Sequence, residues 1–304
     1  MIAVTGAGGF VGAALVSHLR GLGWPVVAFR RGTEPRFAQQ ECFADLAHRA
    51  HLAALVEQGF RADVIVHLAG RVEIALQPDP AQPTTGCRPG QVAVEPLYSA
   101  NVVGTANVVD LAHACGARKI IFASSQTVYG YGEHGRADEQ TLLCPLEHYA
   151  ASKVCAERLL KTSSHSGLAV VILRFPGVFS PQRTSGAVHA LCRAAVKQRV
   201  ILLQPDCAIP FDVLALDDLL PAFAAAIEYE GESLEVFNLS TGEPCSLERL
   251  AERIAALVPG TRIEKRGVPQ PTFQMSAERA ARLLHWQPAP LAHRLTEVLS
   301  VLQL

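Results

Sequence analysis

The chain has 304 residues, of which 49% are hydrophobic and 18% are charged, and its formal net charge at pH 7 is −1. This composition argues against a disordered chain and, because no basic surface is implied, against a protein that binds nucleic acid. The length exceeds that of an average domain, so we expect one large α/β domain with an appended lobe, or two domains.

Short apolar runs alternate with helical patterns through the first half of the chain, as they do in parallel βαβ units. The runs are continuously apolar, which is typical of strands that helices cover on both faces of a sheet. The predicted fold class is therefore α/β, with a Rossmann-type doubly wound parallel sheet. We expect strands at residues 2–4, 25–29, 63–69, 119–124 and 169–175, and helices near 10–22, 101–115 and 147–163.

A smaller mixed lobe is expected after Phe175, where prolines interrupt the regular pattern. We assign residues 1–175 to a dinucleotide-binding domain, to which 211–240 return, and residues 176–210 and 241–304 to a substrate-binding lobe. Residues 76–90 contain four prolines and two glycines, which argue against regular structure there. This segment is either a flap over a pocket or a surface loop, and the sequence leaves both open.

A glycine-rich turn, TGAGGFVG, follows the first predicted strand and opens a helix. Glycines in this position let the backbone approach a pyrophosphate, and the free N–H groups of the helix N-terminus bind the anion. The turn predicts a dinucleotide site formed by Gly6, Gly9, Phe10, Val11 and Gly12.

Arg30 and Arg31 end the second predicted strand, where an Asp or Glu usually binds a free ribose 2′-hydroxyl. Guanidinium groups suit a 2′-phosphate, which they can bind in a bidentate manner. We therefore expect NADP to be favoured over NAD.

Three side chains predict the reaction chemistry. Ser125 lies at the carboxyl end of the strand at 119–124, and Tyr149 and Lys153 are one turn apart on the next predicted helix. Hydride transfer at a carbon requires proton transfer at its oxygen, which a tyrosine can perform if a neighbouring ammonium lowers its pKa. Ser125 would orient the substrate oxygen by a hydrogen bond.

TGAGGFVG, HLAG, NVVGT, SSQTVYG and YAASK, in this order, resemble the extended short-chain dehydrogenase/reductases of the NAD-dependent epimerase/dehydratase family. The resemblance covers nearly the whole chain. It implies catalytic roles for Ser125, Tyr149 and Lys153, and a homodimer formed through the helices near 101–115 and 147–163. It also implies that further residues contact the dinucleotide: Asp45, Leu46, Leu68, Ala69, Gly70, Phe175 and Val178, in addition to Tyr149 and Lys153.

Two departures from the family pattern bear on the substrate. Gln126 and Thr127 stand where sugar dehydratases carry Asp-Glu, which disfavours a 4,6-dehydratase. Gly177 and Phe211 stand where sugar-nucleotide enzymes carry an Asn and an Arg that bind the diphosphate. Both changes argue against a nucleotide-sugar substrate, unless Arg174 or Arg183 supplies the lost cation. The resemblance favours a structural role for Arg174 at the strand end.

Three functions remain open on the sequence. The first is an NAD(P)-dependent epimerase or reductase that interconverts a secondary alcohol and a ketone in a sugar or sugar nucleotide. The second is an NADPH-dependent reductase of a non-nucleotide aldehyde or ketone. The third, a non-catalytic dinucleotide sensor or scaffold, is disfavoured by the intact Ser125, Tyr149 and Lys153.

The eight cysteines are scattered, without a CxxC pair or a Cys/His cluster at zinc-ligand spacing, so we expect reduced thiols and no metal site. Met1 is followed directly by IAVTG, which lacks the basic region and long apolar stretch of a signal peptide, and no run of 18 apolar residues occurs. We therefore expect a cytoplasmic protein with a small-molecule substrate and no contact with membranes.

Overall fold

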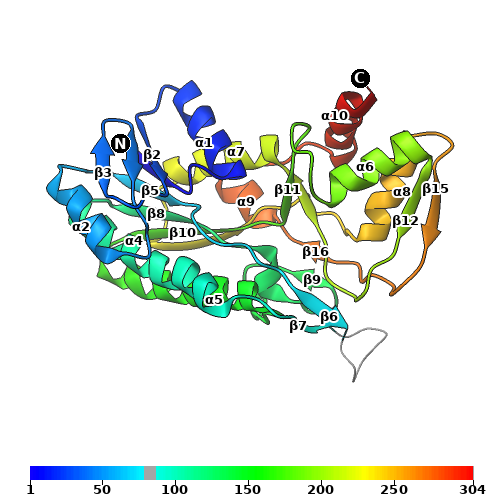
Figure 1. Ribbon diagram of the computed structural model, residues 1–304, viewed down its shortest axis with the longest axis horizontal. Coiled ribbons are helices and arrows are strands. Elements are labelled where there is room, and N and C mark those ends of the chain that lie inside the picture. The colour runs from blue at the N-terminus through cyan, green and yellow to red at the C-terminus, as the bar shows by residue number, and fades with distance from the viewer. Residues whose placement is uncertain (79–86, 304) are drawn as a thin grey trace.

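A large sheet forms the centre of the fold in the computed structural model, which describes residues 1–78 and 87–303 (Figure 1). Neighbouring strands are parallel, except for one antiparallel pair at one edge of the sheet. In the described part of the chain the sheet has eight strands, in the spatial order β14 (Leu234–Asn238), β10 (Ala169–Arg174), β8 (Lys119–Ala123), β5 (Val64–His67), β1 (Ile2–Thr5), β2 (Val26–Arg30), β4 (Glu41–Phe43) and β3 (Arg36–Ala38). The predicted doubly wound parallel sheet is confirmed.

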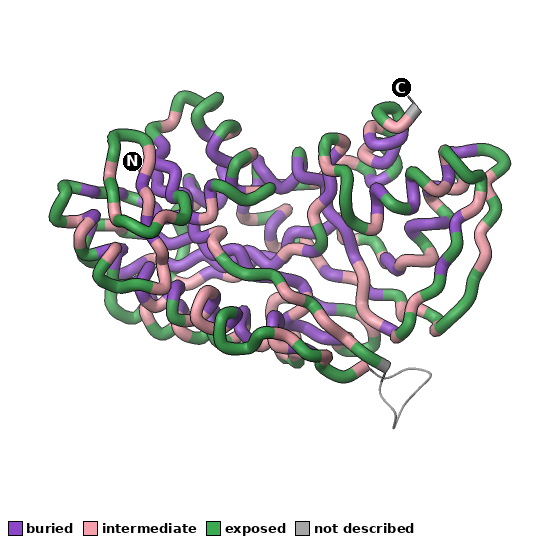
Figure 2. Tube along the Cα trace, in the orientation of Figure 1, coloured by how far each residue is buried: buried purple, intermediate pink, exposed green. Residues whose placement is uncertain are grey.

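Helices cover both faces of this sheet, which explains why its strands are continuously apolar. Successive strand residues point to opposite faces, so Ile2 and Val4 join one core cluster and Ala3 joins another. The first cluster includes residues of α1 (Phe10–Gly21) and α7 (Leu216–Glu228). The second includes residues of α2 (Arg49–Glu57), α4 (Gly104–Cys115) and α5 (His148–Ser163). Figure 2 shows the buried strands between these two helical layers.

A smaller group of elements has its own core cluster at the other end of the molecule (Figure 1). It contains α6 (Ala187–Gln198), α8 (Leu247–Leu257), α10 (Leu291–Gln303) and the parallel pair β12 (Val200–Leu203) and β15 (Arg262–Lys265). The parallel pair β11 (Gly177–Phe179) and β13 (Val213–Ala215) joins it to the sheet domain.

One segment of the expected lobe packs against the large sheet instead. Ala280 in α9 (Glu278–Leu283), Leu284 and Trp286 are buried in the cluster that contains α1 and α7. The short pair β9 (Arg136–Ala137) and β16 (Gln274–Met275) connects this segment to the chain after β8. The division of the chain into two domains stays a prediction, and α9 lies on the sheet side of it.

The segment 76–90 contains regular structure, contrary to the expectation from its prolines. β6 (Leu76–Pro78) and β7 (Cys87–Pro89) form an antiparallel pair in which Gln77 lies opposite Arg88. Pro78 and Pro89 are tolerated because they occupy the ends of very short strands, where fewer ladder hydrogen bonds are lost. The tip, residues 79–86, lies outside the described residues.

The remaining described elements are α3 (Val94–Tyr98), a π-helical turn η1 (Ser99–Val103), and two 3₁₀ turns, η2 (Gln126–Tyr129) and η3 (Ser164–Ser166). A search of the described residues finds no helix with the length and apolar character needed to cross a membrane.

Candidate active site

The glycine turn between β1 and α1 has the geometry of an anion-binding cradle. Gly6 has a φ of 70°, which favours glycine, and its carbonyl oxygen accepts a hydrogen bond of 2.9 Å from the Gly9 N–H. A Cβ on Gly12 would lie 2.2 Å from the Gly6 oxygen, so only glycine fits there. The turn leaves the first N–H groups of α1 free, as a pyrophosphate requires.

Two adjoining cavities, of about 410 and 550 Å³, follow the carboxyl edge of the sheet on either side of this turn. They share Gly6, Gly9, Leu68 and Gly70, so together they form one cleft. Ala69, Arg30, Arg31, Asp45 and Leu46 line the smaller cavity. The larger one, the catalytic cavity, is lined by Phe10, Val11, Gly12, Ser125, Tyr149, Lys153, Phe175 and Val178. The structure thus brings the site residues expected from the sequence together along one cleft, which fits a dinucleotide.

The two arginines at the end of β2 differ in their surroundings. Arg30 Nε donates a hydrogen bond of 3.0 Å to Glu41 Oε1, so this guanidinium is already paired with a carboxylate. Arg31 is exposed at the rim of the smaller cavity and makes no hydrogen bond or ion pair recorded among the described residues. Of the two, Arg31 is the group available to a 2′-phosphate.

Tyr149 and Lys153 lie one turn apart at the start of α5, and Glu147 fixes this start. The Glu147 carboxylate accepts hydrogen bonds from the Tyr149 N–H (2.6 Å) and the Ala150 N–H (2.7 Å), which caps the helix. Lys153 Nζ donates to the carbonyl oxygen of Ala123 at the end of β8 (2.9 Å). This contact holds the catalytic helix against the strand that leads to Ser125.

Burial dominates the electrostatics of the pair. It raises the pKa of Tyr149 to about 12, against a smaller lowering effect of the hydrogen bond with Ser125. It also lowers the pKa of Lys153 to about 8, opposed by the charge of Glu157. The expectation that Lys153 lowers the pKa of Tyr149 is wrong for the protein without ligands. Its ammonium lies 5.9 Å from the centre of the tyrosine ring and is directed to a carbonyl oxygen.

Ser125 is placed to donate a hydrogen bond into the cavity. Its hydroxyl oxygen accepts from the Thr127 N–H (3.2 Å) and the Thr127 hydroxyl (3.0 Å). A hydroxyl has two acceptor positions and one proton, so both acceptor positions are used and the proton serves the hydrogen bond to Tyr149.

A buried ion pair holds α5 against the end of β10, next to the catalytic side chains. Arg174, at the end of β10, donates to both carboxylate oxygens of Glu157 on α5 at 2.9 and 2.6 Å. Ser124 donates to the same carboxylate at 2.6 Å, and Arg174 also donates to the Tyr129 hydroxyl at 2.8 Å. The pair joins β8, β10 and α5, which agrees with a structural role for Arg174.

Asn101 lies inside the π-helical turn η1, where it joins two parts of the site. Its side-chain oxygen accepts from the Arg71 N–H (2.7 Å), and its amide donates to the Arg71 carbonyl (2.9 Å) and to the Ser152 hydroxyl (2.9 Å). It therefore fixes the chain after Gly70 to the catalytic helix.

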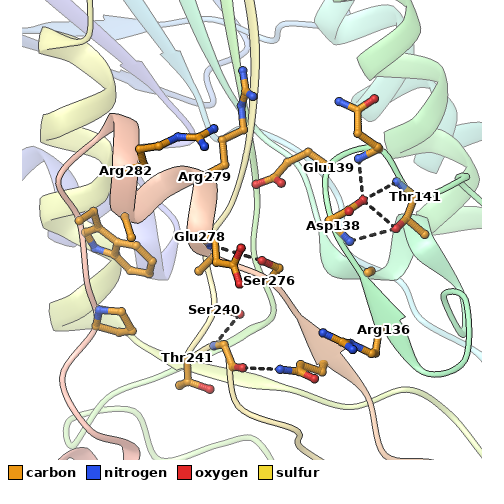
Figure 3. Close-up of a pocket in the computed structure, with 18 of the residues that line it drawn as sticks. Arg136, Asp138, Glu139, Thr141, Ser240, Thr241, Ser276, Glu278, Arg279 and Arg282 are labelled. Carbon is orange, nitrogen blue, oxygen red and sulfur yellow. Dashed lines mark hydrogen bonds between the residues drawn. The ribbon is translucent and has the colours of Figure 1, made fainter.

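A third cavity, of about 910 Å³, is larger but has a different character (Figure 3). It lies between α9 and the β9/β16 pair, with Arg279 and Arg282 on one side and Asp138 and Glu139 on the other. Asp138 is satisfied locally by Gln140 and Thr141. Its lining, as far as the structure describes it, contains no tyrosine, lysine or glycine-rich turn, so we do not assign the reaction to it.

Metal binding has no support in the described residues, since no cluster of three or more His, Cys, Asp or Glu could hold an ion there. His67 is buried between two hydroxyl groups, those of Thr5 (2.7 Å) and Thr105 (3.1 Å). Burial lowers the pKa of His67 to about 3, so this side chain is neutral.

Several residues of the catalytic cavity were not identified from the sequence. Glu147 precedes the tyrosine by two positions, which could have indicated a helix cap. Val72, Ile74 and Leu76 also line the cavity, and their alternating spacing was the signal for an extended segment with one apolar face. Arg183, which the sequence offered as a compensating cation, also lines the cavity, from the turn after β11.

Comparison with known proteins identifies the family of the chain. The model of the NAD dependent epimerase/dehydratase family matches residues 2–240. The chain is 27% identical to the UDP-glucose 4-epimerase of Azospirillum brasilense, covering 94% of this chain and 87% of that protein. It is 26% identical to the 2-alkyl-3-oxoalkanoate reductase of Stenotrophomonas maltophilia, covering 87% of this chain and 77% of that protein. Among solved structures, MoeE5 in complex with UDP-glucuronic acid and NAD has a TM-score of 0.78 and 25% identity, covering 99% of this chain and 98% of that one. The chain therefore belongs to the NAD dependent epimerase/dehydratase family and is an oxidoreductase of the epimerase type.

Proposed function

We propose that this enzyme moves a hydride between a nicotinamide dinucleotide and a secondary alcohol or ketone, with Tyr149 exchanging the proton of the substrate oxygen. The observation that carries the proposal is the convergence of Ser125, Tyr149 and Lys153 on one cavity that is continuous with the glycine turn. A nicotinamide dinucleotide, when bound, supplies or accepts the hydride. All other steps are performed by the side chains of this chain.

Each of the three side chains has a distinct task. The Tyr149 phenol donates a proton to a carbonyl oxygen during reduction, and its phenolate accepts a proton from an alcohol during oxidation. The Ser125 hydroxyl, which is hydrogen-bonded to Tyr149 in the protein without ligands, donates to the same substrate oxygen and stabilises the charge that develops on it. The ammonium of Lys153 uses one donor on Ala123, which leaves two donors for the hydroxyl groups of a cofactor ribose.

The substrate type has two candidates. The similarity to the UDP-glucose 4-epimerase and to MoeE5 supports epimerisation of a sugar nucleotide. Gly177 and Phe211 support a reductase of a non-nucleotide ketone, because their side chains offer a diphosphate neither an amide group nor a cation. The similarity to the 2-alkyl-3-oxoalkanoate reductase supports the same candidate.

The cofactor preference and the quaternary structure belong to the proposal. Arg31, together with the absence of a carboxylate at the end of β2, supports NADP over NAD. A homodimer formed through α4 and α5 is proposed by analogy with the family. Contacts between these helices place them side by side on one face of the sheet. Cys155 on α5 is exposed, and so is Val103 in η1, directly before α4.

The proposal is tested by Tyr149→Phe, assayed with UDP-glucose and with a 2-alkyl-3-oxoalkanoate. Removal of one hydroxyl should leave cofactor affinity within about twofold and lower kcat by a factor of about 10² to 10⁴, the usual contribution of a positioned acid or base. Tyr98→Phe, on α3 outside the cavity, is the matched control and should retain full activity. Undiminished turnover in Tyr149→Phe would remove Tyr149 from the mechanism.

A further inference from the structure

The catalytic cavity extends past Tyr149 into a part whose walls are apolar. Val72, Ile74 and Leu76 are alternate residues of the extended segment that leads from β5 into β6, and all three line the cavity. Side chains of an extended chain point alternately to opposite sides, so this spacing turns one apolar face toward the cavity. Glu73, between two of them, pairs instead with Arg71.

The opposite wall comes from the segment before β13. Ile209, Pro210 and Phe211 line the cavity there, and Leu146 closes it beside the start of α5. The two walls are tied together, because Cys87 Sγ in β7 donates to the Ala208 carbonyl oxygen at 3.0 Å. We call the space between Val72, Ile74, Leu76, Leu146, Ile209 and Phe211 the apolar slot.

Large apolar side chains remain exposed at this slot. Val72 is 66% exposed and Ile74 is 52% exposed. Apolar side chains left in water around a concave site mark a place where a ligand covers them.

Few groups in the cavity could bind a diphosphate. Its described lining has two cationic side chains, Lys153 and Arg183. Lys153 is directed to Ala123, while Arg183 donates to the Val178 carbonyl (2.7 Å) and stacks on Phe10 at 4.7 Å.

The unsatisfied polar atoms of the lining point to the same conclusion. Gln126 Oε1 and Asp212 Oδ2 are buried and have no hydrogen-bond partner among the described residues. Burial raises the pKa of Asp212 to about 7, so near neutral pH this carboxyl can also donate a proton. Gln126 Oε1 can only accept, as can the oxygens of an ionised diphosphate, so a diphosphate would leave this atom unsatisfied.

We propose that the substrate of this site is a ketone or secondary alcohol whose body is an alkyl or aryl hydrocarbon lying in the apolar slot, rather than a nucleoside diphosphate sugar. This inference rests on the proposed hydride transfer at Tyr149 and names the substrate class for it. The reacting carbonyl lies at Ser125 and Tyr149, and the hydrocarbon extends between the wall at 72–76 and the wall at 209–211.

The test is a binding series on the full chain saturated with NADPH or NADH, whichever binds. The ligands are methyl ketones from 2-butanone to 2-decanone, and UDP-glucose represents the competing substrate class. Binding is measured by the change in cofactor fluorescence. Burial of each methylene should lower Kd about fourfold until the slot is filled. The longest ketone should bind more tightly than UDP-glucose. A Kd that does not change with chain length, or tighter binding of UDP-glucose, would overturn the inference.

A pair of variants assigns the effect to the slot. Ile74→Asn should reduce the dependence of Kd on chain length, whereas Leu142→Asn, at a residue that is 78% exposed and outside the cavity, should leave it unchanged. An unchanged dependence in Ile74→Asn would also overturn the inference. Failure of both NADPH and NADH to bind would instead refute the proposed hydride transfer, and this inference with it.

Discussion

The ammonium of Lys153 should make the free energy of unfolding depend on pH in a specific way. Burial lowers its pKa from the usual 10.5 to about 8 in the folded protein without ligands. A lysine that is more acidic in the folded state binds fewer protons there than in the unfolded state, so stability rises as the pH increases from about 8 toward 10.5. Below pH 8 the buried charge costs about 3 kcal/mol, because each pKa unit corresponds to about 1.4 kcal/mol.

Lys153→Met isolates this cost. At pH 7 the variant should gain the full cost of about 3 kcal/mol relative to wild type, less what the lost hydrogen bond to Ala123 contributed. The difference between the two proteins should then shrink by about 2 kcal/mol between pH 7 and about pH 9.5. Titrations of the cofactor-free proteins with urea at each pH measure it. Tyr149 does not contribute in this range, because burial raises its pKa to about 12.

The control is Lys197→Met, at an exposed position on α6. Water solvates this side chain in both states, so its stability difference from wild type should not vary with pH. A constant difference for Lys153→Met over the same range would show that its ammonium is solvated in the folded protein. It would also refute the account of the site as a dry cavity in which burial dominates.

Two further predictions concern the cofactor and the assembly. Arg31→Ala should lower the affinity for NADPH by about tenfold or more and leave the affinity for NADH within about twofold, since a hydrogen bond to a charged group contributes about 1.5–3 kcal/mol. Equal losses of affinity for both cofactors in a fluorescence titration would remove the reason to prefer NADP. Sedimentation equilibrium at micromolar concentration should give the mass of two chains, and Val103→Glu should reduce it to one; a single-chain mass for the unaltered protein would contradict the homodimer.

The sheet could be predicted from the sequence because its strands are short, apolar and separated by helical patterns. The sequence also predicts which strand residues belong to which core cluster, because successive residues such as Ile2, Ala3 and Val4 point to opposite faces of the sheet. The β6/β7 pair could not be predicted, because it depends on the chain returning after residue 78 to pair with Cys87–Pro89. Prolines exclude long central strands, but they leave strands of a few residues possible.

The spacing of Tyr149 and Lys153 placed both residues on one helix face, but it could not show where the ammonium is directed. That depends on the carbonyl of Ala123, which a different segment supplies. With the ammonium held there, desolvation outweighs its attraction for a phenolate, and the Tyr149 pKa rises instead of falling. At neutral pH the phenol is therefore the stable form before ligands bind. A protonated Tyr149 is ready to give its proton to a carbonyl oxygen, whereas oxidation of an alcohol first requires the phenolate to be stabilised.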